Sequence, residues 1–184
     1  TAILLMLVIA NLTAIFGASW DLLVGRTGQM SLGHALFFGV GAYATALLYV
    51  YLNLEPWATV SIAALIGFAI ALFIGFPCLR VKGPYLALVT MAFPLIMTGV
   101  VYYFKDITGG ERGIYGIPRF FPFLGLYQQR LAEYYLTLIL MLISSMIIYK
   151  IANSKTGIVL VSILDDELAS KACGINVTKY KIMA

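Results

Sequence analysis

The chain has 184 residues, of which 62% are hydrophobic and 11% are charged, with a formal net charge of +4. Soluble domains contain about a quarter charged residues, so this composition excludes an ordinary soluble protein and indicates an integral membrane protein. The single histidine, His34, has no cysteine or acidic neighbour at a metal-ligand spacing. We therefore expect no metal site and no catalytic residue, and Cys78 and Cys173 are expected to be free thiols.

Five apolar runs follow one another, each long enough at about 1.5 Å per residue to cross a hydrocarbon core of about 30 Å. They cover residues 2–20, 32–52, 57–76, 84–104 and 134–151. The sequence thus predicts an all-α, polytopic membrane protein with about five transmembrane helices in a single domain over 1–184. Ser31 is expected to cap the second helix. Since the chain starts within an apolar run and ends as a further run begins, we expect no signal peptide and a longer parent protein.

The loops between the runs differ in basic residues, which sets the orientation. With the C-terminal segment 152–184 in the cytoplasm, eight Lys and Arg residues lie inside and four lie outside, as the positive-inside rule requires. The inside set is Arg26, Arg80, Lys82, Lys150, Lys155, Lys171, Lys179 and Lys181, and the outside set is Lys105, Arg112, Arg119 and Arg130. Residues 105–130, rich in Gly, Pro and aromatic residues, then form an external loop.

The third run carries small side chains at every fourth position. Thr59 is followed by Ala63, Gly67, Ala71 and Gly75. In lipid, rows of small residues allow helix backbones to approach closely. We predict that this stripe is a helix-packing face, although membrane helices are rich in Gly and Ala in general.

The segment 155–184 is the one long stretch that is neither strongly apolar nor rich in turns. Asp165 is expected to be the N-cap of a short helix with Asp166 and Glu167 in its first turn. Glu167 and Lys171 form an i,i+4 pair, and Gly174 stands where a left-handed residue would end the helix. A helix of about two turns is not stable alone in water, so it is expected to dock on another surface.

Polar residues gather near the start of the second run. Gln29, Ser31 and His34 are costly near a membrane unless they are paired or face water, and Gly28, Gly33, Gly39 and Gly41 allow close backbone approach. We expect a substrate pathway lined by Gln29, Ser31, His34, Tyr43, Tyr85 and Thr90. For His34 itself, structural hydrogen bonding, pathway lining and a chemical role all remain open.

Four segments resemble, in order, those of one family. Residues 28–43 (GQMSLGHALFFGVGAY) are similar to the Gly-x-x-Ser-Leu-Gly-His-Ala signature of LivM-like branched-chain amino acid permease subunits. Residues 79–90 (LRVKGPYLALVT), 108–114 (TGGERGI) and 165–181 (DDELASKACGINVTKYK) resemble three further family segments. The chain departs from the pattern at Leu86, Pro94 and the inserted pair Glu111–Arg112.

This resemblance implies the permease fold and role of an ABC importer. Residues 165–174 would be the loop that couples the permease to separate ATPase subunits, through Asp165, Asp166, Glu167, Ala169, Gly174 and Ile175. It also implies a second permease subunit, an extracytoplasmic substrate-binding protein and a bacterial or archaeal plasma membrane. The chain has no G-x-x-x-x-G-K-[ST] loop. We therefore expect no enzyme activity and no cofactor of its own, with ATP bound by the partner subunits. We also expect no nucleic-acid partner.

Other functions remain possible on the sequence alone. Urea and short-amide permeases share the same signatures, so these signatures only weakly indicate which substrate is transported. From a different class, a membrane channel or membrane enzyme could be centred on Gln29, Ser31 and His34. The scarcity of ionisable residues within the spans argues against that second reading, since ion paths and acid–base centres usually contain them.

Overall fold

A computed structural model describes residues 2–78, 81, 84–117 and 120–183. Over this part of the chain the regular structure is helical and no strand occurs, which confirms the prediction of an all-α protein. Arg80, Lys82 and Arg119, which entered the charge count, lie outside the described residues, as do Leu79 and Gly83 of the second family-like segment.

Five of the described helices are long and apolar enough to cross a membrane, as the five apolar runs predicted. They are α1 (Ala2–Thr27), α2 (His34–Leu52), α3 (Pro56–Cys78), α4 (Pro84–Tyr103) and α6 (Leu126–Ala152). Between and after them lie α5 (Lys105–Thr108), the 3-10 helix η1 (Gly110–Arg112), α7 (Lys155–Asp165), α8 (Glu167–Ala172) and α9 (Val177–Met183). The protein is thus a multi-pass membrane protein.

The helices group into two compact units, each described by itself. The first, here the α1/α6 unit, comprises residues 1–30 and 121–184; the second, the α2–α4 unit, comprises residues 31–120. The prediction that 1–184 forms one domain stays a prediction.

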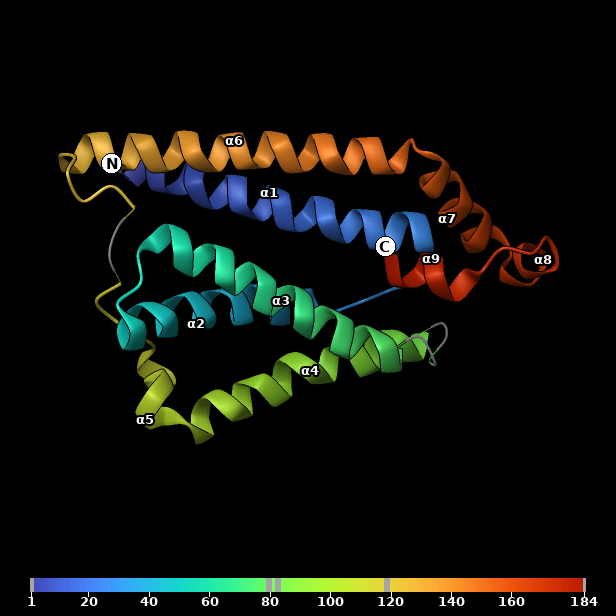
Figure 1. Cartoon of the computed structure of the whole chain (residues 1–184), viewed down its shortest axis with the longest axis horizontal. Helices are drawn as coiled ribbons and strands as arrows, with labels where there is room; N and C mark the ends of the chain where they lie inside the picture. Colours follow the sequence, from blue (N-terminus) through green and yellow to red (C-terminus); the bar gives the residue numbers. More distant parts are fainter. Residues whose placement is uncertain (1, 79–80, 82–83, 118–119, 184) are drawn as a thin grey trace. The chain divides into compact units, whose positions relative to one another are not determined.

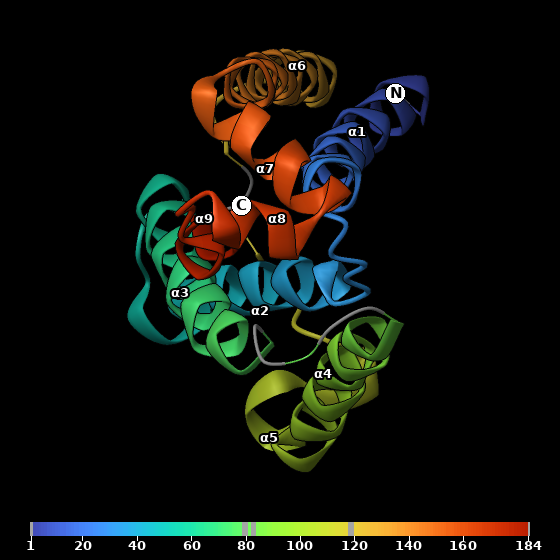
Figure 2. The same cartoon turned by 90° about the vertical axis from the view of Figure 1, so that its right-hand side faces the viewer.

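In the α1/α6 unit, the two long helices lie side by side along their length (Figures 1 and 2). The Asn11 side-chain amide on α1 donates a hydrogen bond to the Thr137 hydroxyl on α6 at 3.3 Å. Thr137 also donates to the Tyr134 carbonyl oxygen of its own helix at 3.0 Å, so its hydroxyl accepts one hydrogen bond and donates another. Asn11, the strongly polar residue inside the first run, therefore serves helix association.

In the α2–α4 unit, α3 packs against α2. The small-residue stripe is buried at Thr59 and Ala63, which are 0% and 4% exposed. At Gly67 and Gly75, however, an added Cβ would meet nothing within 4 Å. These glycines therefore do not serve close packing against any described residue, and a packing role for Gly67, Ala71 and Gly75 stays a prediction.

Several expected boundaries are corrected. The helix predicted for 2–20 continues to Thr27, and the helix predicted for 134–151 starts at Leu126, because the aromatic and charged residues at the ends of the apolar runs extend the helices rather than stop them. The loop expected for 105–130 consequently ends at Gly125 and contains α5 and η1. Cys78, which lies beyond the apolar run predicted for 57–76, is the last residue of α3.

The expected cap of the second helix is also wrong. Helix α2 begins at His34 with Gly33 as its N-cap, and no side chain caps it. The Ser31 hydroxyl instead accepts a hydrogen bond from the Gly33 N–H at 3.3 Å, a local turn that competes with capping.

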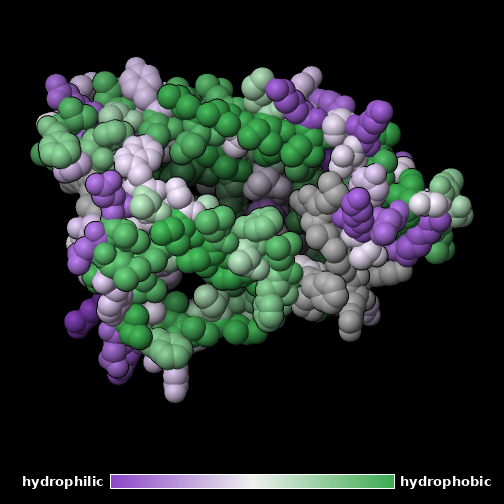
Figure 3. Space-filling model, in the orientation of Figure 1, coloured by the Kyte–Doolittle hydropathy of each residue, from purple (hydrophilic) through white to green (hydrophobic). Residues whose placement is uncertain are grey.

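Apolar side chains cover much of the surface of the spans. In Figure 3 the surface along the middle of α6 is hydrophobic and hydrophilic side chains gather toward its ends. Only eight apolar residues among those described are buried: Leu36, Val40, Ala46, Ala63, Leu86, Leu160, Ile163 and Val177. This pattern fits helices that meet lipid or further spans rather than water.

The Asn11–Thr137 bond can be tested by replacing the hydroxyl. Thr137→Val should destabilise the α1–α6 pair by about 0.6 kcal/mol, the average value of an interhelical hydrogen bond in a membrane protein, whereas Thr137→Ser should retain the stability. Thermal unfolding in detergent micelles measures the difference. Thr13→Val is the control, because the Thr13 hydroxyl bonds only to the Ile9 carbonyl of its own helix; equal losses for Thr13→Val and Thr137→Val would contradict the assignment.

Candidate coupling segment and the α2–α4 pocket

The segment 152–184 folds into three short helices, α7, α8 and α9, where one was expected. Ser154 caps α7 by accepting from the Gly157 N–H, and Gly157 lies so close to Ala152 that an added Cβ would be 2.1 Å from its carbonyl oxygen. Leu160, Ile163 and Val177 are at most 3% exposed. These residues are buried where α7 contacts α1, α6, α8 and α9, and this packing stabilises helices too short to be stable alone.

Helix α8 is capped by Asp166, not by Asp165 as predicted. The Asp166 carboxylate accepts hydrogen bonds from the N–H groups of Leu168 at 2.8 Å and Ala169 at 3.0 Å. Asp165 is the last residue of α7. Since either aspartate could cap a helix by composition, the choice depends on where α7 ends, and the Ser170 hydroxyl fixes this by donating to the Ser162 carbonyl at 3.0 Å.

The end of α8 has the geometry expected at Gly174. This glycine has a φ of +80°. The Gly174 N–H donates to the Lys171 carbonyl at 3.0 Å and the Ile175 N–H donates to the Ser170 carbonyl at 3.1 Å, which together form a Schellman motif. An added Cβ would meet nothing within 4 Å, so glycine is required here by its backbone conformation rather than by space.

Glu167 pairs with two lysines. The expected bond to Lys171 is present at 2.7 Å, and a second bond of 2.7 Å reaches Lys181 on α9. The hydrogen bonds from Lys171 and from Lys181 hold the pKa of the Glu167 carboxyl at about 2, below its ordinary value of 4.5. Because the folded value is the lower one, the contact stabilises the segment above about pH 4.5 and loses that effect as the pH falls toward 2.

The outer face of α8 is exposed. Leu168 is 74% exposed and Ala169 and Ala172 are exposed beside it, whereas Ser170 is buried on the opposite face. Two caps, an ion-pair cluster and contacts with α7 and α9 thus hold this helix in place, while its apolar face remains uncovered by the described residues. Such a face is suited to docking on another surface.

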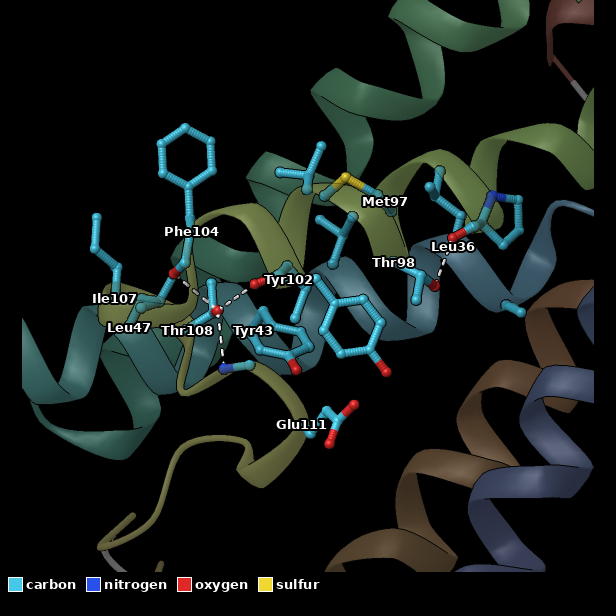
Figure 4. Close-up of a pocket in the computed structure, with 17 residues that line it drawn as sticks. Leu36, Tyr43, Leu47, Met97, Thr98, Tyr102, Phe104, Ile107, Thr108 and Glu111 are labelled. Atoms are coloured by element: carbon cyan, nitrogen blue, oxygen red, sulfur yellow. Dashed lines mark hydrogen bonds between the residues drawn. The ribbon is translucent and has the colours of Figure 1, made fainter.

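A pocket of about 630 Å³ lies in the α2–α4 unit, with walls from α2, α4, α5 and η1 (Figure 4). Its apolar lining includes Leu36, Leu47, Met97 and Ile107. Polar groups come from Tyr43, Thr98, Tyr102, Thr108 and Glu111. Among the lining residues Glu111 alone is charged, and no ion-pair partner for it occurs within the described part of the chain.

The segment after α5 shapes one wall of this pocket. The Thr108 hydroxyl lies against the carbonyl oxygens of Val101 at 2.7 Å and Phe104 at 3.0 Å, and it accepts from the Gly110 N–H at 3.3 Å. An added Cβ on Gly109, whose φ is +75°, would be 2.1 Å from the Gly113 carbonyl oxygen. The Thr-Gly-Gly motif therefore builds the tight turn that carries Glu111 to the pocket.

The expected pathway residues lie on different elements. Tyr43 lines the pocket, whereas Tyr85 is 71% exposed at the start of α4. His34 is half-buried at the first position of α2, and Ser31 lies in the turn before it. Thr90 is 5% exposed, and Gln29 belongs to the α1/α6 unit. Their pathway role stays a prediction.

The sequence did not identify two residues of these sites, Lys181 and Glu111. Lys181 is separated from Glu167 by fourteen positions, and only the turn at Gly174 brings them together. Glu111 was noted as a departure from a motif, but nothing local indicated that it lines a pocket. A search for acidic residues next to glycine turns would have found Glu111, whereas no local signal identifies Lys181.

Five spans, a partly apolar pocket between two of them and a capped helix with an exposed face define a polytopic permease. The chain matches, over residues 2–184, the family described as branched-chain amino acid transport system / permease component. It therefore belongs to that family, as the four ordered motifs predicted, and the family is one of transport permeases.

Two curated relatives are also described as branched-chain amino acid permeases. The high-affinity branched-chain amino acid transport system permease protein LivM of Salmonella typhimurium is 30% identical, and that of Escherichia coli K12 is 31% identical, each over 202 aligned residues. The alignments cover 96% of this chain and 48% of each relative, so the chain spans about half the length of these relatives. No solved structure matches it significantly.

The Glu167–Lys181 bond predicts how α9 is held. Lys181→Met should raise the pKa of Glu167 toward its ordinary value and speed amide hydrogen exchange in α9 at neutral pH, by about two- to tenfold if one charge-assisted hydrogen bond is lost. Lys179→Met is the matched control, because Lys179 lies exposed on the same helix. Equal exchange rates in the two variants would show that the bond does not hold α9.

Proposed function

We propose that this chain is part of the membrane-spanning permease subunit of an ATP-driven importer of branched-chain amino acids. The observation that carries the proposal is the family match over residues 2–184. The capped helix α8, with an exposed apolar face, supports a role in docking. The resemblance of residues 165–181 to the family's coupling loop supports ATPase subunits as the docking partner.

The same proposal covers partners and location. ATP is bound and hydrolysed by separate ATPase subunits, a second permease subunit completes the membrane path, and an extracytoplasmic binding protein delivers the substrate. The chain lies in a bacterial or archaeal plasma membrane with residues 152–184 in the cytoplasm. It has no cofactor and no catalytic role of its own. Alternating access would follow from ATP binding that favours one of two arrangements of the packed spans.

The pocket favours an amino acid over urea as the substrate. Its Leu, Met and Ile side chains suit an aliphatic body, and the Glu111 carboxylate suits an ammonium group. Urea is neutral and has no apolar body, so it would leave both features unmatched. The urea or short-amide alternative is thus the less favoured of the two.

The docking role of α8 predicts how variants co-purify with the ATPase. Glu167→Lys reverses the charge at the centre of the lysine pair, and Gly174→Val forces a β-branched residue into a left-handed conformation, at a cost of about 1–2 kcal/mol. Both should weaken retention of the ATPase or abolish leucine uptake at unchanged ATP hydrolysis. Gly174→Asn is the control, because asparagine tolerates this conformation and nothing lies within 4 Å of the added Cβ.

Unchanged association together with unchanged uptake in both Glu167→Lys and Gly174→Val would overturn the docking role. An intact complex that moves urea but not leucine would leave the architecture standing and refute the substrate.

The substrate preference predicts the effect of Glu111→Gln. Binding to the assembled permease, measured without the binding protein, should weaken by about tenfold for leucine and for 3-methylbutylamine, which shares its ammonium group and aliphatic body, since a charge-assisted hydrogen bond is lost. Isovalerate and urea should bind neither protein. Asp106→Asn, on the exposed α5 but outside the pocket lining, is the control; a loss equal to that of Glu111→Gln would refute the role of Glu111.

A further inference from the structure

The segment between α1 and α2, residues 28–33, contains the boundary between the two compact units, which falls after Met30. It carries Gln29 and Ser31, two of the six residues that the sequence suggested for the substrate pathway. Each end of it is fixed to a different element, and each contact lies within one unit.

The first end is fixed to α7. Gly28 has a φ of +65°, and a Cβ added to it would lie 2.5 Å from Leu164 Cδ1. The Gly28 N–H donates to the Val24 carbonyl at 3.0 Å, and the neighbouring Thr27 is 4% exposed. Leu164 therefore sits directly on the Gly28 backbone. It lies in the last turn of α7, just before Asp166 caps α8.

The second end is fixed to α4. The Leu32 N–H donates to the Thr90 hydroxyl oxygen at 3.0 Å, and Thr90 in turn donates to the Leu86 carbonyl at 2.9 Å. A Cβ added to Gly33 would lie 3.2 Å from the Thr90 carbonyl oxygen. The backbone at Leu32 and Gly33 thus rests on the backbone of α4, and the Thr90 side chain joins them.

The stretch between these ends is short and not helical. The Met30 N–H donates to the Gly28 carbonyl at 3.1 Å, and the Gln29 N–H contacts the Thr27 hydroxyl at 3.3 Å. Each residue can add at most about 3.6 Å of reach, so a linker of so few residues has little slack. The contact at Thr90 is buried, whereas the Leu164 side chain at the other end is 43% exposed. A short linker held at both ends passes a displacement from one contact to the other.

We propose that residues 28–33 are a mechanical joint that passes movement of the α7–α8 segment to α4, with Leu164 and Thr90 as the positioning residues at its two ends. The proposal rests on the proposed function, because it takes α8 as the helix that the ATPase moves. The proposal gives the signature at 28–34 and Thr90, the threonine of the second family-like segment, one shared role. That role is force transmission rather than contact with substrate.

The decisive variants are Thr90→Val and Thr90→Ser in the complete transporter reconstituted in liposomes. Valine has nearly the same shape but cannot accept the Leu32 N–H, whereas serine can. Thr90→Val should lower the leucine moved per ATP hydrolysed by about fivefold, the change expected from one hydrogen bond of ordinary strength, with ATP hydrolysis and complex assembly retained. Thr90→Ser should behave as the unsubstituted protein. A wild-type ratio in Thr90→Val, or an equal loss in Thr90→Ser, would overturn the joint.

A second readout does not depend on the substrate. Leu95→Cys, at an exposed position of α4 outside the pocket lining, is labelled with a maleimide in a background of Cys78→Ser and Cys173→Ser, with and without ATP. ATP should change the labelling rate with threonine or serine at position 90 and should not change it in Thr90→Val. A response to ATP that persists in Thr90→Val, or one that is absent even with Thr90, would overturn the proposal.

This readout separates the two proposals. If ATP changes the labelling through Thr90 while leucine is not transported, the joint stands and the proposed substrate fails.

The other end is tested in the same assay by Leu164→Ala, with Leu164→Met as the control that nearly keeps the side-chain volume. If both ends belong to one joint, Leu164→Ala combined with Thr90→Val should uncouple no more than the stronger single variant, because effects within one unit are not additive. Fully additive losses would show two unrelated contacts.

Discussion

The structure depends on the need to satisfy backbone hydrogen bonds inside a hydrocarbon layer. A helix satisfies them within itself, and a non-helical segment in lipid leaves N–H and C=O groups without partners. Five helices therefore carry the apolar runs, and the irregular segments lie between them. Where a non-helical backbone adjoins the spans, a specific partner fixes it, as at Leu32 on Thr90 and at the turn around Thr108.

Hydroxyl groups in the spans illustrate the same constraint. Those of Thr45, Ser61 and Thr98 donate to a carbonyl four residues earlier in their own helix, so they need no other partner. Thr90 and Thr137 differ because each also accepts a bond from another segment. Polar residues within a span are thus explained by local bonding until a second, distant partner is found, and these two have one.

The C-terminal segment is held together differently from the spans, because its residues are more hydrophilic. Its helices are short, and they are held by buried apolar residues, two caps and the Glu167 ion pairs. These contacts fix the position of α8 and would suit the docking role proposed for it. Gly28 under Leu164 connects this segment to the end of α1.

The sequence alone determined the features that depend on a few neighbouring residues. Hydropathy over about twenty positions predicted five membrane-spanning helices, and local spacing predicted the Glu167–Lys171 pair and the left-handed Gly174. It failed by one residue at the cap of α8 and by several at the ends of α1 and α6, because helix ends depend on tertiary packing as well as on propensity.

Only the tertiary structure decided which distant groups meet: Lys181 with Glu167, Thr90 with Leu32, Leu164 with Gly28, and Glu111 with the pocket. Such contacts depend on how separate helices pack, and the periodicity of a single helix carries no information about that packing.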